Sequence, residues 1–150
     1  MGSLGLGLLL VAGTPFGVMP VEGSRFRGRY GDALVSAAGP AVNLALAGLA
    51  LTALAVLLRA GVDPYVLGVN PLWTLGLLNI ALVLFNLLPI PPLDGSGVLA
   101  SLVPVYRNFL RDPRHAKFGW AAFGLVFLFA GRLFEWAESL AGLYVAWLLP

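Results

Sequence analysis

The residue of this sequence whose type and setting most suggest chemistry is a single carboxylate, Asp94, in the stretch FNLLPIPPLDGSG. The stretch is mostly apolar and contains three prolines, which remove backbone donors and push the residues before them toward extended conformations. They are Pro89, Pro91 and Pro92. We therefore expect one helix to stop near Leu88 and a short second helix to run from Gly95 to about Tyr106. Asp94 is then either the N-cap of that short helix or an ion, proton or metal site, since ionisable residues within membrane segments are usually functional. The two interpretations are compatible.

Small and polar residues recur at helical spacing in two apolar segments. Asn79 and Asn86 lie seven residues apart on one face of a helix expected over 72–88, and Gly76 shares that face. The second stripe, on a helix expected over 33–58, consists of Ser36, Gly39, Asn43 and Ala47, with Pro40 as a potential kink. Small residues let membrane helices approach closely and asparagines bond between them, so packing alone explains either stripe. Two stripes beside a broken helix with an aspartate instead indicate a shared interior site.

The composition indicates which elements position these residues. Of the 150 residues, 59% are hydrophobic and only 11% are charged, with a mean hydropathy of +0.91, which excludes an ordinary soluble domain. The uncharged stretch at 33–58 and the apolar one at 64–93 each exceed the roughly 20 residues that a helix needs to cross a bilayer. The absence of cysteine excludes disulfides and thiolate metal sites. We therefore predict an all-α integral membrane protein, with about three or four transmembrane helices and a proline-broken helix at the PPLDG motif.

We expect a single membrane domain over 1–150, oriented by its basic residues. By the positive-inside rule, the loops around Arg25 and Arg107 lie in the cytoplasm and the loop around Asp63 lies outside. The expected parts are an N-terminal apolar segment and loop over 1–32, transmembrane helices over 33–58 and 72–88, a broken segment and short helix over 89–106, a basic cytoplasmic loop over 107–117, and a C-terminal apolar segment over 118–150 whose crossing the sequence leaves open. The apolar start at 4–12 lacks the basic residues of a signal peptide, so we do not interpret it as one.

Two motifs carry a resemblance to a known family. GPAVN (39–43) resembles the A-G-P-x-x-N helix, and FNLLPIPPLDGSGVL (85–99) resembles the N-x-x-P-x-x-P-L-D-G motif, of the site-2 protease family of intramembrane zinc metalloproteases, peptidase family M50. The resemblance implies that Asp94 is the third zinc ligand. It also implies that Asn43 and Asn86 shape the active-site cleft and help to hold substrate backbone unwound for cleavage. The residues that it marks as structural are Gly39, Pro40, Asn79, Pro89, Pro91, Pro92 and Gly95.

The same resemblance implies partners and a location. It implies zinc in the complete family site, transmembrane proteins as substrates, and a multi-pass protein in the lipid bilayer of a prokaryotic cell membrane. We expect no nucleic-acid partner.

The sequence departs from the family at its first two zinc ligands, which are the histidines of an H-E-x-x-H helix whose glutamate activates a water molecule. No H-E-x-x-H occurs here, and the one histidine, His115, lies in the basic RDPRHAK stretch, as a solvated loop residue would. Glu22, Glu135 and Glu138 have no partners at metal-ligand spacing. We therefore expect that this polypeptide alone does not hold catalytic zinc, and the sequence leaves open whether it acts as an enzyme.

Three interpretations follow from that departure. The favoured one is a fragment of an intramembrane protease that lacks the H-E-x-x-H helix and is inactive as written. The second is a pseudoprotease that keeps the substrate-binding half and acts as a membrane adaptor. The third takes the broken helix as an element of a transporter or channel, which also use discontinuous helices.

Overall fold

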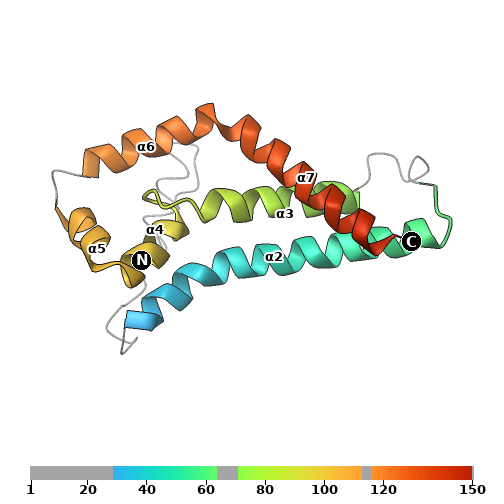
Figure 1. Cartoon of the computed structure of the whole chain (residues 1–150), viewed down its shortest axis with the longest axis horizontal. Helices are drawn as coiled ribbons and strands as arrows, with labels where there is room; N and C mark the ends of the chain where they lie inside the picture. Colours follow the sequence, from blue (N-terminus) through green and yellow to red (C-terminus); the bar gives the residue numbers. More distant parts are fainter. Residues whose placement is uncertain (1–28, 64–70, 113–115, 150) are drawn as a thin grey trace, which may run out of the picture.

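The structure is a computed structural model that describes residues 29–63, 71–112 and 116–149, and this part of the chain is entirely helical. Its six helices, labelled as in Figure 1, are α2 (Arg29–Arg59), α3 (Pro71–Asn86), α4 (Asp94–Leu102), α5 (Pro104–Arg111), α6 (Ala116–Leu128) and α7 (Ala130–Leu148). The all-α prediction is therefore confirmed for the described residues.

Helix α2 is the longest of the described helices. Within the described residues, its segment 31–59 is the one helix long and apolar enough to cross a membrane, judged by length and composition. Helix α3, with 16 residues, is also apolar but only about 24 Å long at 1.5 Å per residue, short of a ~30 Å hydrocarbon core. The expected bundle of three or four spanning helices remains a prediction.

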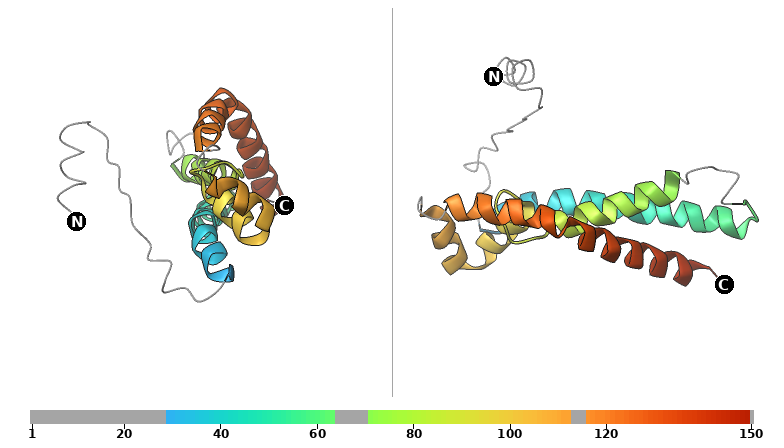
Figure 2. Two further views of the ribbon diagram at one scale, coloured as in Figure 1. Left: turned by 90° about the vertical axis from the view of Figure 1, so that its left-hand side faces the viewer. Right: turned by 90° about the horizontal axis from the view of Figure 1, so that it is seen from above.

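Helices α2 and α3 lie side by side in opposite directions, and α7 packs across both (Figures 1 and 2). The core cluster lies near the Arg59 end of α2 and consists of Leu51, Leu54, Ala141 and Val145, with Leu58, Leu72, Trp73, Ile80 and Leu149 packed against it. Helix α7 contributes through one stripe at four-residue spacing, Leu133, Ala137, Ala141 and Val145, all buried. Spacing of four keeps these side chains on one helix face.

Gly76 shows why α2 and α3 can pack closely. A Cβ on Gly76 would lie 2.5 Å from Cδ2 of Leu51, the largest fully buried side chain among the described residues. Leu51 therefore fills the space that the missing side chain leaves on α3. Small residues have this role where membrane helices approach closely.

The chain after Asp94 differs from the expectation of one short helix followed by a basic loop from residue 107. It forms two helices, with Val103 in an extended conformation (φ −112°, ψ 103°) between them. Pro104 is the cause, because proline disfavours helix in the preceding residue and suits the first position of a new helix. Arg107 and Arg111 consequently lie on helix α5, which corrects the assignment of this stretch to a loop.

The C-terminal segment 118–150 contains most of α6 and the whole of α7, joined at Phe129. The charged residues Arg132, Glu135 and Glu138 lie within α7 and do not end the helix. Arg132 donates from Nη1 to Oε2 of Glu135 over 3.1 Å, and both side chains are exposed.

Candidate functional site

Asp94 is the first residue of α4, as the three prolines predict. Short-range bonds replace the helical pattern before it: the amide of Ile90 donates to the carbonyl of Leu88 (2.8 Å), and the amide of Leu93 donates to that of Ile90 (2.9 Å). The peptide bond between Pro91 and Pro92 is cis. The proline segment is thus an irregular connection between the end of α3 and the start of α4.

Asp94 does not cap α4. The N-cap is Leu93, with an extended backbone (φ −73°, ψ 154°), and no side chain makes a capping bond there. Asp94 already has helical geometry, so the N-cap interpretation from the sequence is wrong. Its carboxylate still lies in the first helical turn, where the helix dipole favours negative charge.

Ser96 and Gly95 fix the start of α4 against the end of α3. The Ser96 hydroxyl donates to the carbonyl of Leu93 over 2.7 Å, and both residues are buried. A Cβ on Gly95 would collide with the backbone carbonyl groups of Leu87 and Leu88. Only glycine allows this close approach of backbone to backbone, so Gly95 is required for the chain to fold back at the PPLDG motif.

Helix α4 in turn packs on α2 through two matched contacts. A Cβ on Gly39 of α2 would lie 3.0 Å from Oδ2 of Asp94, and a Cβ on Gly97 of α4 would collide with the hydroxyl of Ser36. Ser36 and Gly39 lie three residues apart on α2. Their partners Gly97 and Asp94 lie three residues apart on α4 in the reverse order, so the two helices run antiparallel. The GPAVN and PPLDG motifs, more than 40 residues apart in the sequence, thus meet at Gly39 and Asp94.

The depth of this contact follows from helix geometry. Gly39 lies ten residues from the first residue of α2 and twenty from the last, or about 15 Å and 30 Å along the axis. Asp94 is half-buried. Its carboxylate therefore lies beside the middle part of the long apolar helix α2, next to Gly39, which has no side chain.

The other predicted site residues differ in what their side chains do. Asn79 is buried, and its amide donates to the carbonyl of Leu75 on its own helix over 2.8 Å, which satisfies the packing interpretation. Asn43 is half-buried, one turn beyond Gly39 on α2, and Asn86 is half-buried at the last position of α3. Within the described residues, neither of these two amides hydrogen-bonds to Asp94.

The described residues do not form a complete metal site. They include no group of three or more His, Cys, Asp or Glu side chains that could hold a metal ion. Glu135 and Glu138 are exposed on α7, whereas Glu22 and His115 lie outside the described residues. Zinc sites take at least three protein ligands, so Asp94 fits the role of one ligand and the described part of the chain supplies no others beside it.

A small cavity with several polar residues in its lining borders the α2–α4 contact, and the sequence did not indicate this cavity. It measures about 240 Å³ and is lined by Asp32, Ser36, Gly97, Ala100, Ser101 and Arg107. The Nε atom of Arg107 is buried and has no hydrogen-bond partner in the described part of the chain. The one sequence feature that could have indicated the α2–α4 contact is the interval of three residues shared by Ser36 and Gly39 on α2 and by Asp94 and Gly97 on α4. No sequence feature indicated that Arg107 lines the cavity beside this contact.

Comparison with known proteins supports the resemblance. Residues 65–131 match the model of peptidase family M50. The chain is 38% identical over 103 residues to "Putative zinc metalloprotease YwhC" of Bacillus subtilis (strain 168), covering 65% of this chain and 47% of that protein. It is 40% identical over 104 residues to "Putative zinc metalloprotease Rip2" of Mycolicibacterium smegmatis, covering 66% of this chain and 38% of that protein. No solved structure matches the chain.

These matches support membership of the chain in peptidase family M50, the site-2 protease family. The chain spans less than half the length of each of these two relatives. The family match includes α3, the PPLDG motif and α4, but begins after α2. The pairing of Gly39 with Asp94 is therefore evidence from the structure alone that α2 belongs to the same site.

Proposed function

We propose that this chain is the part of a site-2-protease-like intramembrane zinc metalloprotease that supplies the carboxylate ligand and the substrate cleft. It would act on membrane-embedded protein substrates as a multi-pass protein of a prokaryotic cell membrane. One observation carries the proposal. The Asp94 carboxylate is held beside the interior of the long apolar helix α2, opposite a glycine and without a protein counter-charge among the described residues.

A carboxylate in such a setting is costly unless an opposite charge compensates it. The helix dipole at the start of α4 offsets part of that cost. A divalent cation would compensate the rest, and the carboxylate can approach the backbone of α2 closely because Gly39 has no side chain. When bound, zinc would polarise the scissile carbonyl and supply the nucleophilic water.

The irregular proline segment supports the same proposal. Backbone without helical hydrogen bonds is tolerated at membrane depth only where protein encloses it or where it borders a watery cavity. The segment between α3 and α4 has α6 as a neighbour, since a Cβ built on Gly119 would lie 3.4 Å from Pro91. Such a segment gives an extended substrate a place to lie next to Asp94.

Asn43 and Asn86 fit the role of substrate ligands. Each carries a carboxamide that both donates and accepts hydrogen bonds, which matches the needs of an unwound peptide backbone. Both are half-buried, and the structure shows no bond that occupies either amide within the described residues. Asn79, whose amide is used within α3, is excluded from this role.

The test supplies an H-E-x-x-H helix ahead of the chain and measures zinc content and cleavage of a transmembrane reporter. Asp94→Asn keeps the size of the side chain but removes the charge, so it should lower zinc content and abolish cleavage while thermal unfolding stays nearly unchanged. Asn86→Ala should lower cleavage more than zinc content. The chain without the added helix should hold far less than one zinc.

Three outcomes would count against the proposal. Full activity of Asp94→Asn would show that the carboxylate is not a ligand. Stoichiometric zinc in the chain alone, lost on Asp94→Ala, would show that the missing ligands are within these 150 residues. Zinc binding without any cleavage by the complemented protein would favour the pseudoprotease, a membrane adaptor that binds substrate without cutting it.

A further inference from the structure

Helix α5 (Pro104–Arg111) has two chemically opposite faces. Val105 and Phe109, four residues apart, form an apolar face and are 78% and 44% exposed. Arg107 and Arg111, also four residues apart, lie on the opposite side, and exposed Asn108 lies at the border between the two faces. An eight-residue helix with this pattern is amphipathic: one face favours water and the other favours an apolar phase.

The third side of α5 attaches it to the bundle. Tyr106 and Leu110 are half-buried, and the Tyr106 hydroxyl donates to the carbonyl of Pro89 over 2.7 Å. The ring of Tyr106 stacks on that of Phe109 at 6.5 Å between centroids. The bond from Tyr106 to Pro89 ties this side of α5 to the proline segment, so the face with Val105 and Phe109 is directed away from that contact.

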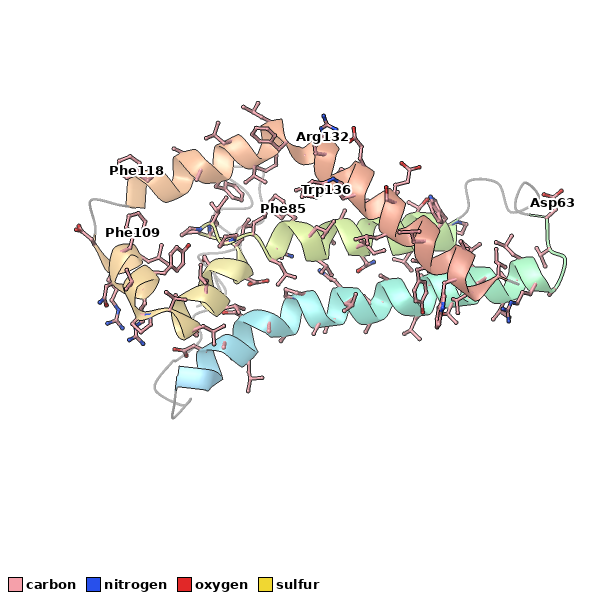
Figure 3. All side chains as sticks on the ribbon, in the orientation of Figure 1. Asp63, Phe85, Phe109, Phe118, Arg132 and Trp136 are labelled. Atoms are coloured by element: carbon pink, nitrogen blue, oxygen red, sulfur yellow. The ribbon has the colours of Figure 1, made fainter. Side chains whose placement is uncertain are left out.

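Helix α5 runs across one end of the bundle, opposite the end where Asp63 lies (Figures 1 and 3). Phe118, at the start of α6, is 65% exposed and lies at the same end as Phe109 (Figure 3). A transverse amphipathic helix with exposed aromatic neighbours is the arrangement found where a protein meets the headgroup layer of a bilayer.

We propose that α5 is an interfacial helix that inserts Val105 and Phe109 at the level of the acyl chains and binds the phosphates of anionic phospholipids with Arg111 and Arg107. The inference rests on the membrane location proposed above, but not on protease activity. Charge complementarity selects the occupant, since two arginines on the polar face attract the negatively charged leaflet and gain little from a zwitterionic one. Arg111, exposed at the last position of α5, is the principal phosphate ligand, because Nε of Arg107 is buried toward the neighbouring cavity.

The absence of cysteine makes the proposal directly testable, because one introduced thiol can be labelled alone. Val105→Cys and the matched control Asn108→Cys are labelled with a nitroxide in the full chain reconstituted in bilayer nanodiscs. Collision with O₂ reports the hydrocarbon phase, and collision with a water-soluble nickel complex reports water. The label at 105 should be accessible to O₂ and protected from nickel, and the label at 108 should show the reverse.

The anionic component is tested by the relative association of spin-labelled phosphatidylglycerol and phosphatidylcholine with the chain. Arg111→Gln should lower the preference for phosphatidylglycerol by up to about fivefold, the factor that corresponds to ~1 kcal/mol per basic residue at such a surface. Arg132→Gln is the control, because Arg132 already pairs with Glu135 and should leave the preference unchanged.

Three results would overturn the proposal. Nickel access at 105 would place α5 in water. Protection of 105 from both reagents would show that protein, such as a second copy of the chain, covers this face. An unchanged lipid preference in Arg111→Gln would refute the recognition of anionic lipid. None of these outcomes depends on zinc or cleavage, so they leave the proposed protease function to its own test.

Discussion

Gly39→Ala tests the contact on which the candidate site depends. The added methyl group would lie 3.0 Å from Oδ2 of Asp94, whereas ordinary van der Waals contact begins at 3.4 Å. The carboxylate must therefore move by about 0.4 Å, because Gly39 belongs to a long helix and its backbone cannot easily shift. Metal-ligand distances are set to within about 0.2 Å, so a displacement of this size disturbs a ligand.

The same substitution should not weaken the fold. Alanine is more favourable than glycine in a helix interior by roughly 1 kcal/mol, so the backbone of α2 gains stability. Displacing a group that positions a metal ligand typically costs 10-fold to 100-fold in metal affinity. We expect a loss of about 10-fold in zinc affinity, near 1.4 kcal/mol, with an unchanged or raised unfolding temperature.

The assay compares two variants of the protein complemented with an H-E-x-x-H helix. Gly48→Ala is the matched control, since Gly48 lies on the same helix and a Cβ there would meet nothing within 4 Å. Zinc affinity is measured by competition with a chelator, and stability by thermal unfolding in detergent. Both variants should be at least as stable as the parent, but only Gly39→Ala should lose zinc.

Equal zinc affinity in the two variants would refute the reasoning, because it would mean that Asp94 moves freely or does not ligate. Parallel losses of zinc and of stability in Gly39→Ala would also contradict it, since the effect would then be on helix packing as a whole. The separation of the two readouts is what identifies Gly39 as a residue that makes room for a ligand.

Two further predictions concern the chain around Asp94. Gly95→Ala should destabilise the protein by about 1–3 kcal/mol in thermal or denaturant unfolding, because its methyl group meets the backbone of Leu87, which cannot rotate away as a side chain can; an unchanged midpoint would mean that α3 and α4 are not in contact there. The pair Ser36→Cys and Gly97→Cys should form a disulfide on mild oxidation, detectable by peptide mass mapping, since a Cβ at 97 would lie 3.1 Å from that of Ser36 and disulfides need about 3.5–4.5 Å. Gly48→Cys with Gly97→Cys should stay reduced, and the reverse result would rule out the antiparallel packing of α2 and α4.

The helix-breaking effect of proline predicts the break before Asp94, and the same effect explains an unpredicted break at Pro104. Pro89, Pro91 and Pro92 end one helix and delay the next, as expected from the loss of backbone donors. Pro104 acts in the same way and divides the segment from Gly95 to Tyr106, expected to be one short helix, into two. The apolar residues on both sides of Pro104 concealed the break, because hydropathy alone does not distinguish one helix from two.

The basic stretch after Pro104 shows a different limit. Arginine clusters between apolar segments indicate loops on average, and the stretch from Arg107 was assigned to one. The apolar residues among the charges, however, recur at four-residue spacing, at Val105 and Phe109, and this pattern indicates an amphipathic helix. The net charge of the segment predicts its side of the membrane, while its local structure depends on the spacing of residues that carry no charge.

The stripes of small and polar residues predicted that the helices of 33–58 and 72–88 share a site, but they did not predict the contact between α2 and α4. Ser36 and Gly39 on α2 are related to Gly97 and Asp94 on α4 by the same interval of three, so one antiparallel crossing brings both pairs together. At one pair the hydroxyl of Ser36 faces a glycine, and at the other a glycine faces the carboxylate. The glycine of each pair carries no side chain that would separate the helices, and at Gly39 this lets the Asp94 carboxylate approach the backbone of α2. A half-buried carboxylate held there, with no counter-charge among the described residues, costs free energy that a cation would offset, and this is the physical basis of the proposed role of Asp94 as a metal ligand.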